Sequence, residues 1–256
     1  MRHLPFHIVI PARYGSSRFP GKPLFMIGGK TLIQHVCATA CASAATSVVV
    51  ATDDARIAAS ARSVGVCVCM TSPHHNSGSD RIAEVVAQFN WPDDACVVNV
   101  QGDEPCIPAA VINEVASDLL NISDCSMSTV ATKIVSWEPL FDHNVVKVVV
   151  DARGFALYFS RAAIPWCRHE FNDLTLPFPV SLNIFRHVGL YAYRAGFLRR
   201  FVAWPVAPIE LAESLEQLRV LWYGERIHVC LTNEAIGPGV DVPGDILRLE
   251  QWLPST

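Results

Sequence analysis

The chain has 256 residues, of which 51% are hydrophobic and 17% charged, so it has enough apolar material for a large folded core and disorder is not expected. Its net charge of −4 provides no basic field for a nucleic-acid duplex or an anionic membrane, so any anion site must be built locally. No apolar run approaches the ~20 residues of a membrane span, and Pro11 breaks the N-terminal run too early for a signal peptide. We therefore expect a cytoplasmic protein without nucleic-acid binding or membrane insertion.

In the first half of the chain short β-branched runs alternate with helical patterns, which is typical of βαβ units. In chain order we expect a strand at 6–10, a helix over Thr31–Cys41, a strand at 47–53, a helix over Asp54–Val64, a strand at 66–70, a helix over Arg81–Phe89, strands at 96–103, 128–134, 145–151 and 187–193, and a helix over Glu210–Tyr223. This order predicts an α/β fold with an open, mainly parallel sheet. We expect one domain over residues 1–256, with an excursion at about 162–186 where the periodicity is interrupted.

Two of the expected helices carry further detail. Ser77 and Asp80 have the spacing of a capping box at the start of the third helix. In the last helix four apolar residues fall on one predicted face, and Glu216 and Gln217 lie on its polar flanks; the four are Leu211, Leu215, Leu218 and Trp222.

The segment "IPARYGSSRFPGKPL" at 10–24 places Arg13, Arg18 and Lys22 in one loop directly after the first strand. It is not a P-loop, because Gly15 and Gly21 enclose five residues and a proline replaces the hydroxyl residue, and there is no G-x-G-x-x-G. The carboxyl end of a first parallel strand is nevertheless where open α/β sheets bind ligands, which favours an anion site. The alternative is a solvated loop that happens to be basic.

Two acidic loops complete the pattern. The valine-rich strand at 96–100 is followed by Gln101, Gly102, Asp103 and Glu104, and "GPGVDVPGD" places Asp241 in a second loop near the C-terminus. Carboxylates are hard oxygen ligands that suit Mg²⁺ on a nucleotide. Each loop alone is weak evidence, since Asp241 could be a simple turn or cap residue. Together, one basic and two acidic loops predict a metal and triphosphate site.

The nine cysteines show no C-x-x-C spacing, and their odd number argues against a closed disulfide framework. We expect reduced, mostly buried thiols that act as small hydrophobic groups. We expect His74 and His75 to be a solvated loop pair, because no further His or Cys lies at metal-ligand spacing.

Several motifs together closely resemble the bacterial 3-deoxy-manno-octulosonate cytidylyltransferases, the CMP-Kdo synthetases of lipopolysaccharide biosynthesis. They run in the family's order from about Phe6 to Leu249 and include "IPARYGSSRFPGKPL", "SGSDRIAEVV", "VVNVQGDEPCIP", "YFSRAAIPW", "RHVGLYAYR" and "GPGVDVPGDI". The combination is far more specific than any one motif. The resemblance implies a Rossmann-like nucleotidyltransferase sheet with helices on both faces and a small mixed-sheet excursion, a homodimer, and a Mg²⁺-dependent reaction of CTP with Kdo that yields CMP-Kdo and pyrophosphate.

The resemblance also implies residue roles. The implied catalytic residues are Arg13, Lys22 and Asp103, with Arg18 as a possible helper. CTP would be bound by Ala12, Arg13, Lys22, Ser77, Gly78, Ser79 and Arg81. The sugar would be bound by Gln101, Arg161, His187, Tyr191, Glu216 and Gln217, with the fork of Arg161 suited to its carboxylate. Mg²⁺ would be held by Asp103 and Asp241.

Some of these residues have alternative structural roles, and two positions differ from the family's usual sequence. Arg161 could pair a structural carboxylate, and His187 and Tyr191 could be ordinary core residues. The family usually has threonine and glutamate where this chain has Val242 and Gly244, which predicts a weaker helix cap behind the last aspartate. Two other functions are a cytidylyltransferase for another acidic sugar such as sialic acid, and a catalytically silent nucleotide- or sugar-binding protein.

Overall fold

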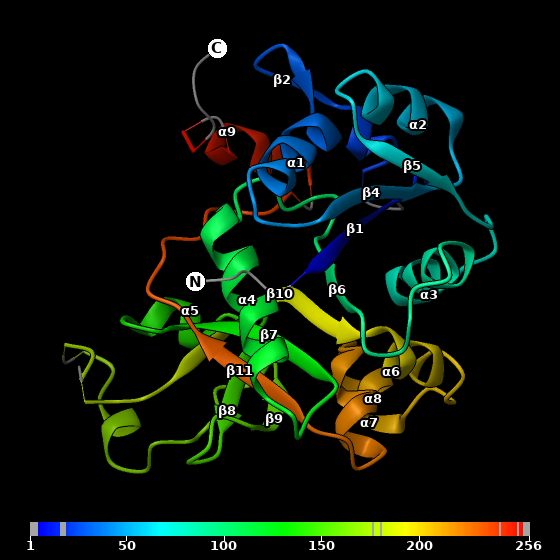
Figure 1. Cartoon of the computed structure of the whole chain (residues 1–256). Coiled ribbons are helices and arrows are strands. Elements are labelled where there is room, and N and C mark those ends of the chain that lie inside the picture. The colour runs from blue at the N-terminus through cyan, green and yellow to red at the C-terminus, as the bar shows by residue number, and fades with distance from the viewer. Residues whose placement is uncertain are drawn as a thin grey trace.

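The structure is a computed structural model that describes residues 5–15, 19–175, 177–179, 181–240, 242–249 and 251–252. Within these residues one open sheet has the order β11-β7-β10-β6-β1-β4-β5, and β8 and β9 form a hairpin beside β10 (Figure 1). Its strands are β1 Phe6–Ala12, β4 Ser47–Thr52, β5 Cys67–Met70, β6 Cys96–Asn99, β7 Met127–Lys133, β8 Lys147–Val150, β9 Ala156–Ser160, β10 Phe185–Arg194 and β11 Ile227–Leu231. A separate small sheet pairs β2 Met26–Ile27 with β3 Lys30–Thr31.

The helices alternate with these strands in the first half of the chain, as predicted. They are α1 Leu32–Cys41, α2 Ala55–Arg62, α3 Gly78–Gln88, α4 Ala109–Asn121, α5 Trp137–Phe141, α6 Ala195–Phe201, α7 Pro208–Glu213, α8 Gln217–Trp222 and α9 Ile246–Leu249. Short 3-10 turns lie at η1 Lys22–Leu24, η2 Glu170–Asn172 and η3 Pro243–Asp245. None of the helices described is long and apolar enough to cross a membrane.

The sheet is mainly parallel, which confirms the predicted class. β4, β1 and β6 pair in parallel, as do β4 with β5 and β7 with β11. β10 is antiparallel to β6, β7 and β8, and β9 is antiparallel to β8. β10 therefore makes the sheet mixed near its middle, and the β8–β9 hairpin adds two further antiparallel pairings beside β10, at the bottom of the view in Figure 1.

Buried side chains form one large cluster on each face of the sheet. Alternation along β1 sends Ile8 and Ile10 to one cluster and Val9 to the other, because successive strand residues point to opposite faces. Apolar residues of α1, α2 and α4 join the first cluster, and those of α3, α6 and α8 join the second. Helices thus cover both faces, as expected.

The helix predicted over 210–223 is wrong as a single element. It divides into α7 and α8 at Ser214, whose φ of 52° is left-handed. The helical period does not continue across that residue, so the predicted apolar face is lost: Leu211 is 69% and Trp222 is 53% exposed. Leu215 and Leu218 are buried as predicted.

The segment predicted as an excursion has its own small core. Ile134, Leu140, Phe171 and Ile184 form a cluster separate from the two main ones, lined by the Trp137 ring. The cysteine prediction is confirmed in part: all nine are free, but only Cys37, Cys69, Cys96 and Cys125 are buried. Cys106, Cys167 and Cys230 are partly buried and Cys41 and Cys67 are exposed, so "mostly buried" is wrong. The two exposed thiols lie at the end of helix α1 and on the edge strand β5.

Candidate active site

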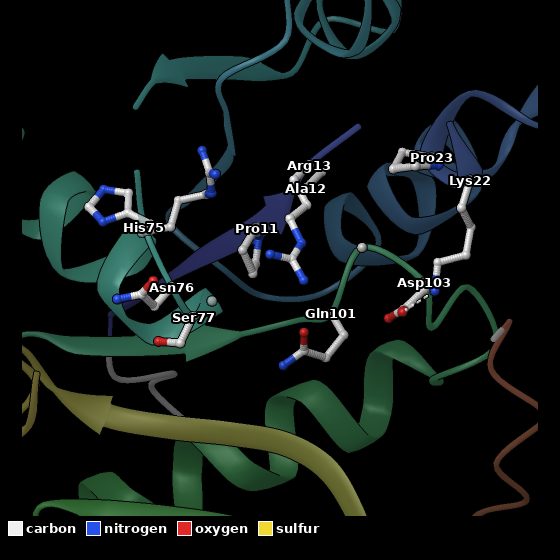
Figure 2. A pocket seen from close by; sticks show the side chains of 13 residues that line it. Pro11, Ala12, Arg13, Lys22, Pro23, His75, Asn76, Ser77, Gln101 and Asp103 are labelled. Carbon is white, nitrogen blue, oxygen red and sulfur yellow. Dashed lines mark hydrogen bonds and ion pairs between the residues drawn. The ribbon is translucent and has the colours of Figure 1, made fainter. Parts of the chain in front are cut away.

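A cavity of about 270 Å³ lies where β1 and β6 end. Between these strands the topology reverses, since the chain runs from β1 to β4 on one side and β6 lies on the other. Open α/β sheets bind ligands at such a switch point. The cavity is lined by Pro11, Ala12, Arg13, Lys22, Pro23, His75, Asn76, Ser77, Gly78, Arg81, Gln101, Gly102 and Asp103. Figure 2 shows Arg13 pointing into the space between Ser77 and the Lys22–Asp103 pair.

Two glycines allow the loops to approach closely. A Cβ on Gly102 would lie 2.8 Å from the backbone oxygen of Pro11, so only glycine lets the β6 loop pack against the end of β1. Gly21 has a φ of +74°, and its N–H donates to the carbonyl of Tyr14 at 3.0 Å, which turns the basic loop back on itself. This turn delivers Lys22 to the cavity.

Lys22 joins all three of the predicted loops. Its side chain is nearly buried, and Nζ donates to Asp103 Oδ2 at 2.5 Å and to the carbonyl of Val240 at 2.6 Å. The N–H of Val240 in turn donates to the carbonyl of Asp103 at 2.9 Å. The structure therefore brings the basic loop, the "QGDEP" loop and the "GPGV" segment together. Asp241 and Arg18, both predicted for this site, lie outside the described residues.

The start of α3 forms the opposite wall of the cavity. The predicted capping box is present, with Asp80 N–H donating to Ser77 Oγ at 3.1 Å and Ser77 N–H to Asp80 Oδ2 at 3.0 Å. The loop before it is tied to the same helix, because Glu84 Oε2 accepts from the N–H of Ser72 at 2.9 Å and lies 2.5 Å from His75 Nε2. His75 is therefore a paired residue of the cavity wall, which corrects the expectation of a solvated pair; His74 is exposed.

Ser79 and Arg81, both in the first turn of α3, are buried, and of the two only Arg81 lines the cavity. The guanidinium of Arg81 donates to Thr71 Oγ1 and lies 3.2 Å from Asp53 Oδ1, and burial lowers its pKa. Ser79 does not line the cavity; its hydroxyl donates to Glu216 Oε2 at 2.8 Å. Asp53 and Thr71 were not singled out from sequence, although both lie at carboxyl ends of strands.

The predicted sugar residues gather mainly in a second cluster on β10 and α8. The rings of His187 and Tyr191 lie 5.4 Å apart, and His187 is 5.0 Å from the ring of Phe159 in β9. His187 Nε2 is 2.9 Å from Thr129 Oγ1, and burial, aided by Arg186, lowers the His187 pKa to about 3. His187 is thus neutral at physiological pH.

Three buried polar atoms in this region have no hydrogen-bond partner among the described residues: Glu216 Oε1, Gln217 Nε2 and Asn99 Oδ1. Burial raises the pKa of Glu216, against the hydrogen bond from Ser79. Buried polar atoms are normally paired, so these three are suited to a polar ligand. Asn99 is not among the residues predicted from sequence, because it lies inside a valine-rich strand and no motif marks it.

Of the remaining predicted sugar residues, Gln101 lines the cavity and Arg161 does not. Arg161 Nε donates to the carbonyl of Glu213 at 2.8 Å, and Nη1 donates to that of His143 at 3.0 Å. The structure thus places Arg161 at the end of β9, held by backbone carbonyls.

Comparisons with known proteins agree with this architecture. A model of the cytidylyltransferase family matches residues 7–227. The 3-deoxy-manno-octulosonate cytidylyltransferase of Nitrosococcus oceani is 50% identical over 98% of this chain and 97% of its own length. The chain belongs to the 3-deoxy-manno-octulosonate cytidylyltransferase family. The enzyme of that name from Idiomarina loihiensis is 53% identical over 96% of this chain and 97% of its own length.

Two solved structures have a similar fold. A CMP:2-keto-3-deoxy-manno-octonic acid synthetase complexed with CTP matches with a TM-score of 0.86 and 38% identity, over 96% of this chain and 97% of that one. A 4-diphosphocytidyl-2C-methyl-D-erythritol synthase matches with a TM-score of 0.64 at 15% identity, which supports the fold alone. The predicted family and fold class are confirmed.

Membership of the cytidylyltransferase family is consistent with a divalent metal. No group of three or more His, Cys, Asp or Glu side chains among the described residues could hold one. Asp103 nevertheless fits a nucleotide-bound ion, because its carboxylate is 34% exposed beside the cavity, and magnesium in nucleotide sites needs only one or two carboxylates with the phosphates.

Proposed function

We propose that this protein transfers CMP from CTP to 3-deoxy-manno-octulosonate, giving CMP-Kdo and pyrophosphate for lipopolysaccharide biosynthesis. The observation that carries the proposal is the Lys22–Asp103 pair at the switch point between β1 and β6, in a chain about half identical to enzymes of that name over nearly its whole length.

In the proposed reaction the anomeric hydroxyl oxygen of Kdo attacks the α-phosphorus of CTP. The bond from that phosphorus to the oxygen bridging to the β-phosphate breaks, and the hydroxyl proton leaves to water or a basic group. The protein's work is positioning and charge neutralisation. Arg13 and Lys22 hold the triphosphate, and the Lys22 ammonium, fixed by Asp103 and the Val240 carbonyl, stabilises the charge that develops on pyrophosphate.

Asp103 and Asp241 hold Mg²⁺ in this proposal. The ion would bind phosphate oxygens and neutralise their charge. At the opposite wall, Ala12 and the residues Ser77, Gly78, Ser79 and Arg81 frame the nucleoside. Arg81 lines the cavity beside Asp53, whereas Ser79 acts from behind the wall through its contact with Glu216.

The sugar lies toward β10 and α8. Its hydroxyls would satisfy Glu216 Oε1 and Gln217 Nε2, which have no hydrogen-bond partner in the described part of the chain. His187, Tyr191 and Gln101 bind other polar groups, and the fork of Arg161 binds the carboxylate. We also propose a cytoplasmic homodimer on the family resemblance; light scattering on a sizing column would measure its mass.

The test is a pyrophosphate-release assay with each nucleoside triphosphate against Kdo and sialic acid, with Mg²⁺ and with excess chelator. We expect release only with CTP, Kdo and Mg²⁺ together. Preference for sialic acid would identify the other acidic-sugar activity. Binding of CTP without release from any sugar would indicate a silent binding protein.

A further inference from the structure

Lys147 in β8 is completely buried and belongs to none of the predicted sites. Its ammonium donates to three backbone carbonyls, those of Asp142 at 2.9 Å, Val145 at 2.6 Å and Arg161 at 2.7 Å. Only the charged ammonium has three N–H bonds, so the three carbonyls favour the charged form of Lys147. Burial acts in the other direction and lowers the Lys147 pKa. Among the described residues Lys147 forms no ion pair with a carboxylate, which is unusual for a buried lysine.

The three carbonyls belong to two segments that meet at Arg161. One is the loop 142–145 between α5 and β8, and the other is the end of β9. Arg161 also contacts the loop directly, because its Nη1 donates to the carbonyl of His143 at 3.0 Å. We call loop 142–145, Lys147 and Arg161, which these hydrogen bonds connect, the frame. The backbone N–H of Arg161 donates to Glu213 Oε2 at 3.0 Å, which attaches the same residue to the end of α7.

This frame lies next to both parts of the proposed site. Lys147 is opposite Arg186 of β10 on one side and Ser160 of β9 on the other, so it is one residue away in register from His187. Loop 142–145, whose carbonyls Lys147 contacts, lines a cavity of about 800 Å³ that extends to Asp103. A shift of the frame would therefore move Arg161 relative to the sugar residues of β10.

We propose that Lys147 is a positioning residue for the sugar substrate: its three hydrogen bonds fix the backbone of Arg161 and of loop 142–145, and thereby orient the Arg161 guanidinium toward the carboxylate of an acidic sugar. The inference rests on the proposed function. Lysine suits the task because one ammonium donates in three directions, whereas the planar fork of arginine cannot.

The experiment compares the wild type with Lys147→Met, which keeps the length of the stem and removes the donors. We expect the KM for Kdo to rise by about tenfold or more, since small misplacements of binding groups have effects of this order, while the KM for CTP changes less than about twofold. Val115→Ala is the matched control, because it removes buried methyl groups from α4, which lines neither cavity. It should lower the melting temperature and leave both KM values unchanged.

A double-variant cycle separates positioning from general stabilisation. If Lys147 acts through Arg161, the variant with both Lys147→Met and Arg161→Ala has the same KM for Kdo as Arg161→Ala alone. Additive effects, or equal rises in both KM values, overturn the inference. If Lys147→Met does not fold, Lys147→Gln is measured against the same criteria. Failure of the wild type to release pyrophosphate from CTP and Kdo would instead overturn the proposed function.

Discussion

At the scale of single residues, Lys22 illustrates how one side chain connects distant parts of the chain. Its contacts with Asp103 and Val240 span separations of 81 and 218 residues. These two contacts hold the Lys22 ammonium in place before any phosphate binds. Preorganised charge is more effective than charge that must be ordered during the reaction.

We therefore predict that Lys22→Ala lowers kcat by on the order of 10²-fold or more, because the ammonium stabilises charge that builds on pyrophosphate in the transition state. Arg13→Ala should behave similarly, and Arg18→Ala should have little effect. Steady-state pyrophosphate release measures this, with the exposed Lys30→Ala in β3 as the control. A change confined to the KM for CTP would make the loop a binding element without a catalytic part.

His187 predicts a pH dependence of stability. Its pKa is about 3 in the folded protein and 6.5 in the ordinary state, so the unfolded chain binds a proton that the folded one excludes. The contribution of neutral His187 to the free energy of unfolding is complete above pH 6.5. It is lost as the pH falls from 6.5 toward 3, by at most about 1.4 kcal/mol per pH unit. Urea unfolding between pH 7 and 5 should show a shallower decline for His187→Gln than for the wild type. Equal slopes would mean that His187 is accessible to protons in the folded state.

At the scale of elements, the active-site cavity is formed by the residues at the ends of the strands and not by the strands themselves. β1 and β6 are ordinary buried strands, but the residues just beyond them form the cavity, and Gly102 is the point of closest approach. The same holds for α3, where the cap at Ser77 lines the cavity and the apolar face only anchors the helix.

We predict that Gly102→Ala reduces kcat/KM for CTP by more than about tenfold, because the added Cβ would meet the Pro11 carbonyl at 2.8 Å and force the loops apart. Gly15→Ala is the control, since a Cβ there meets no atom of the described residues within 4 Å, and Gly15 lies in the basic loop against which Gly102 packs. Wild-type kinetics in Gly102→Ala would show that the β6 loop adapts without cost.

At the scale of the whole molecule, the two core clusters share their strands. Since β1 supplies Ile8 to one cluster and Val9 to the other, neither face can lose its packing without the other. The small cluster around Phe171 is separate from both.

The single-domain proposal therefore predicts one cooperative unfolding transition, with calorimetric and van't Hoff enthalpies that agree. Calorimetry with and without CTP provides the measurement. A second transition, removed by substitution of Phe171→Ala in the small cluster, would make the excursion a separate domain.

The sequence by itself determined the α/β class, the cap at Ser77 and the family, because periodicity, capping and contiguous motifs are local properties of the chain. Only the tertiary structure decided that Lys22 contacts Asp103, that Ser79 contacts Glu216 rather than the cavity, and that α7 and α8 separate at Ser214. In the sequence Lys147 is one polar residue in an apolar strand, and only the fold brings its three carbonyl partners to it. The physical reason is that hydrogen bonds between distant segments, and a single left-handed residue within a helical pattern, leave no periodic trace in the sequence.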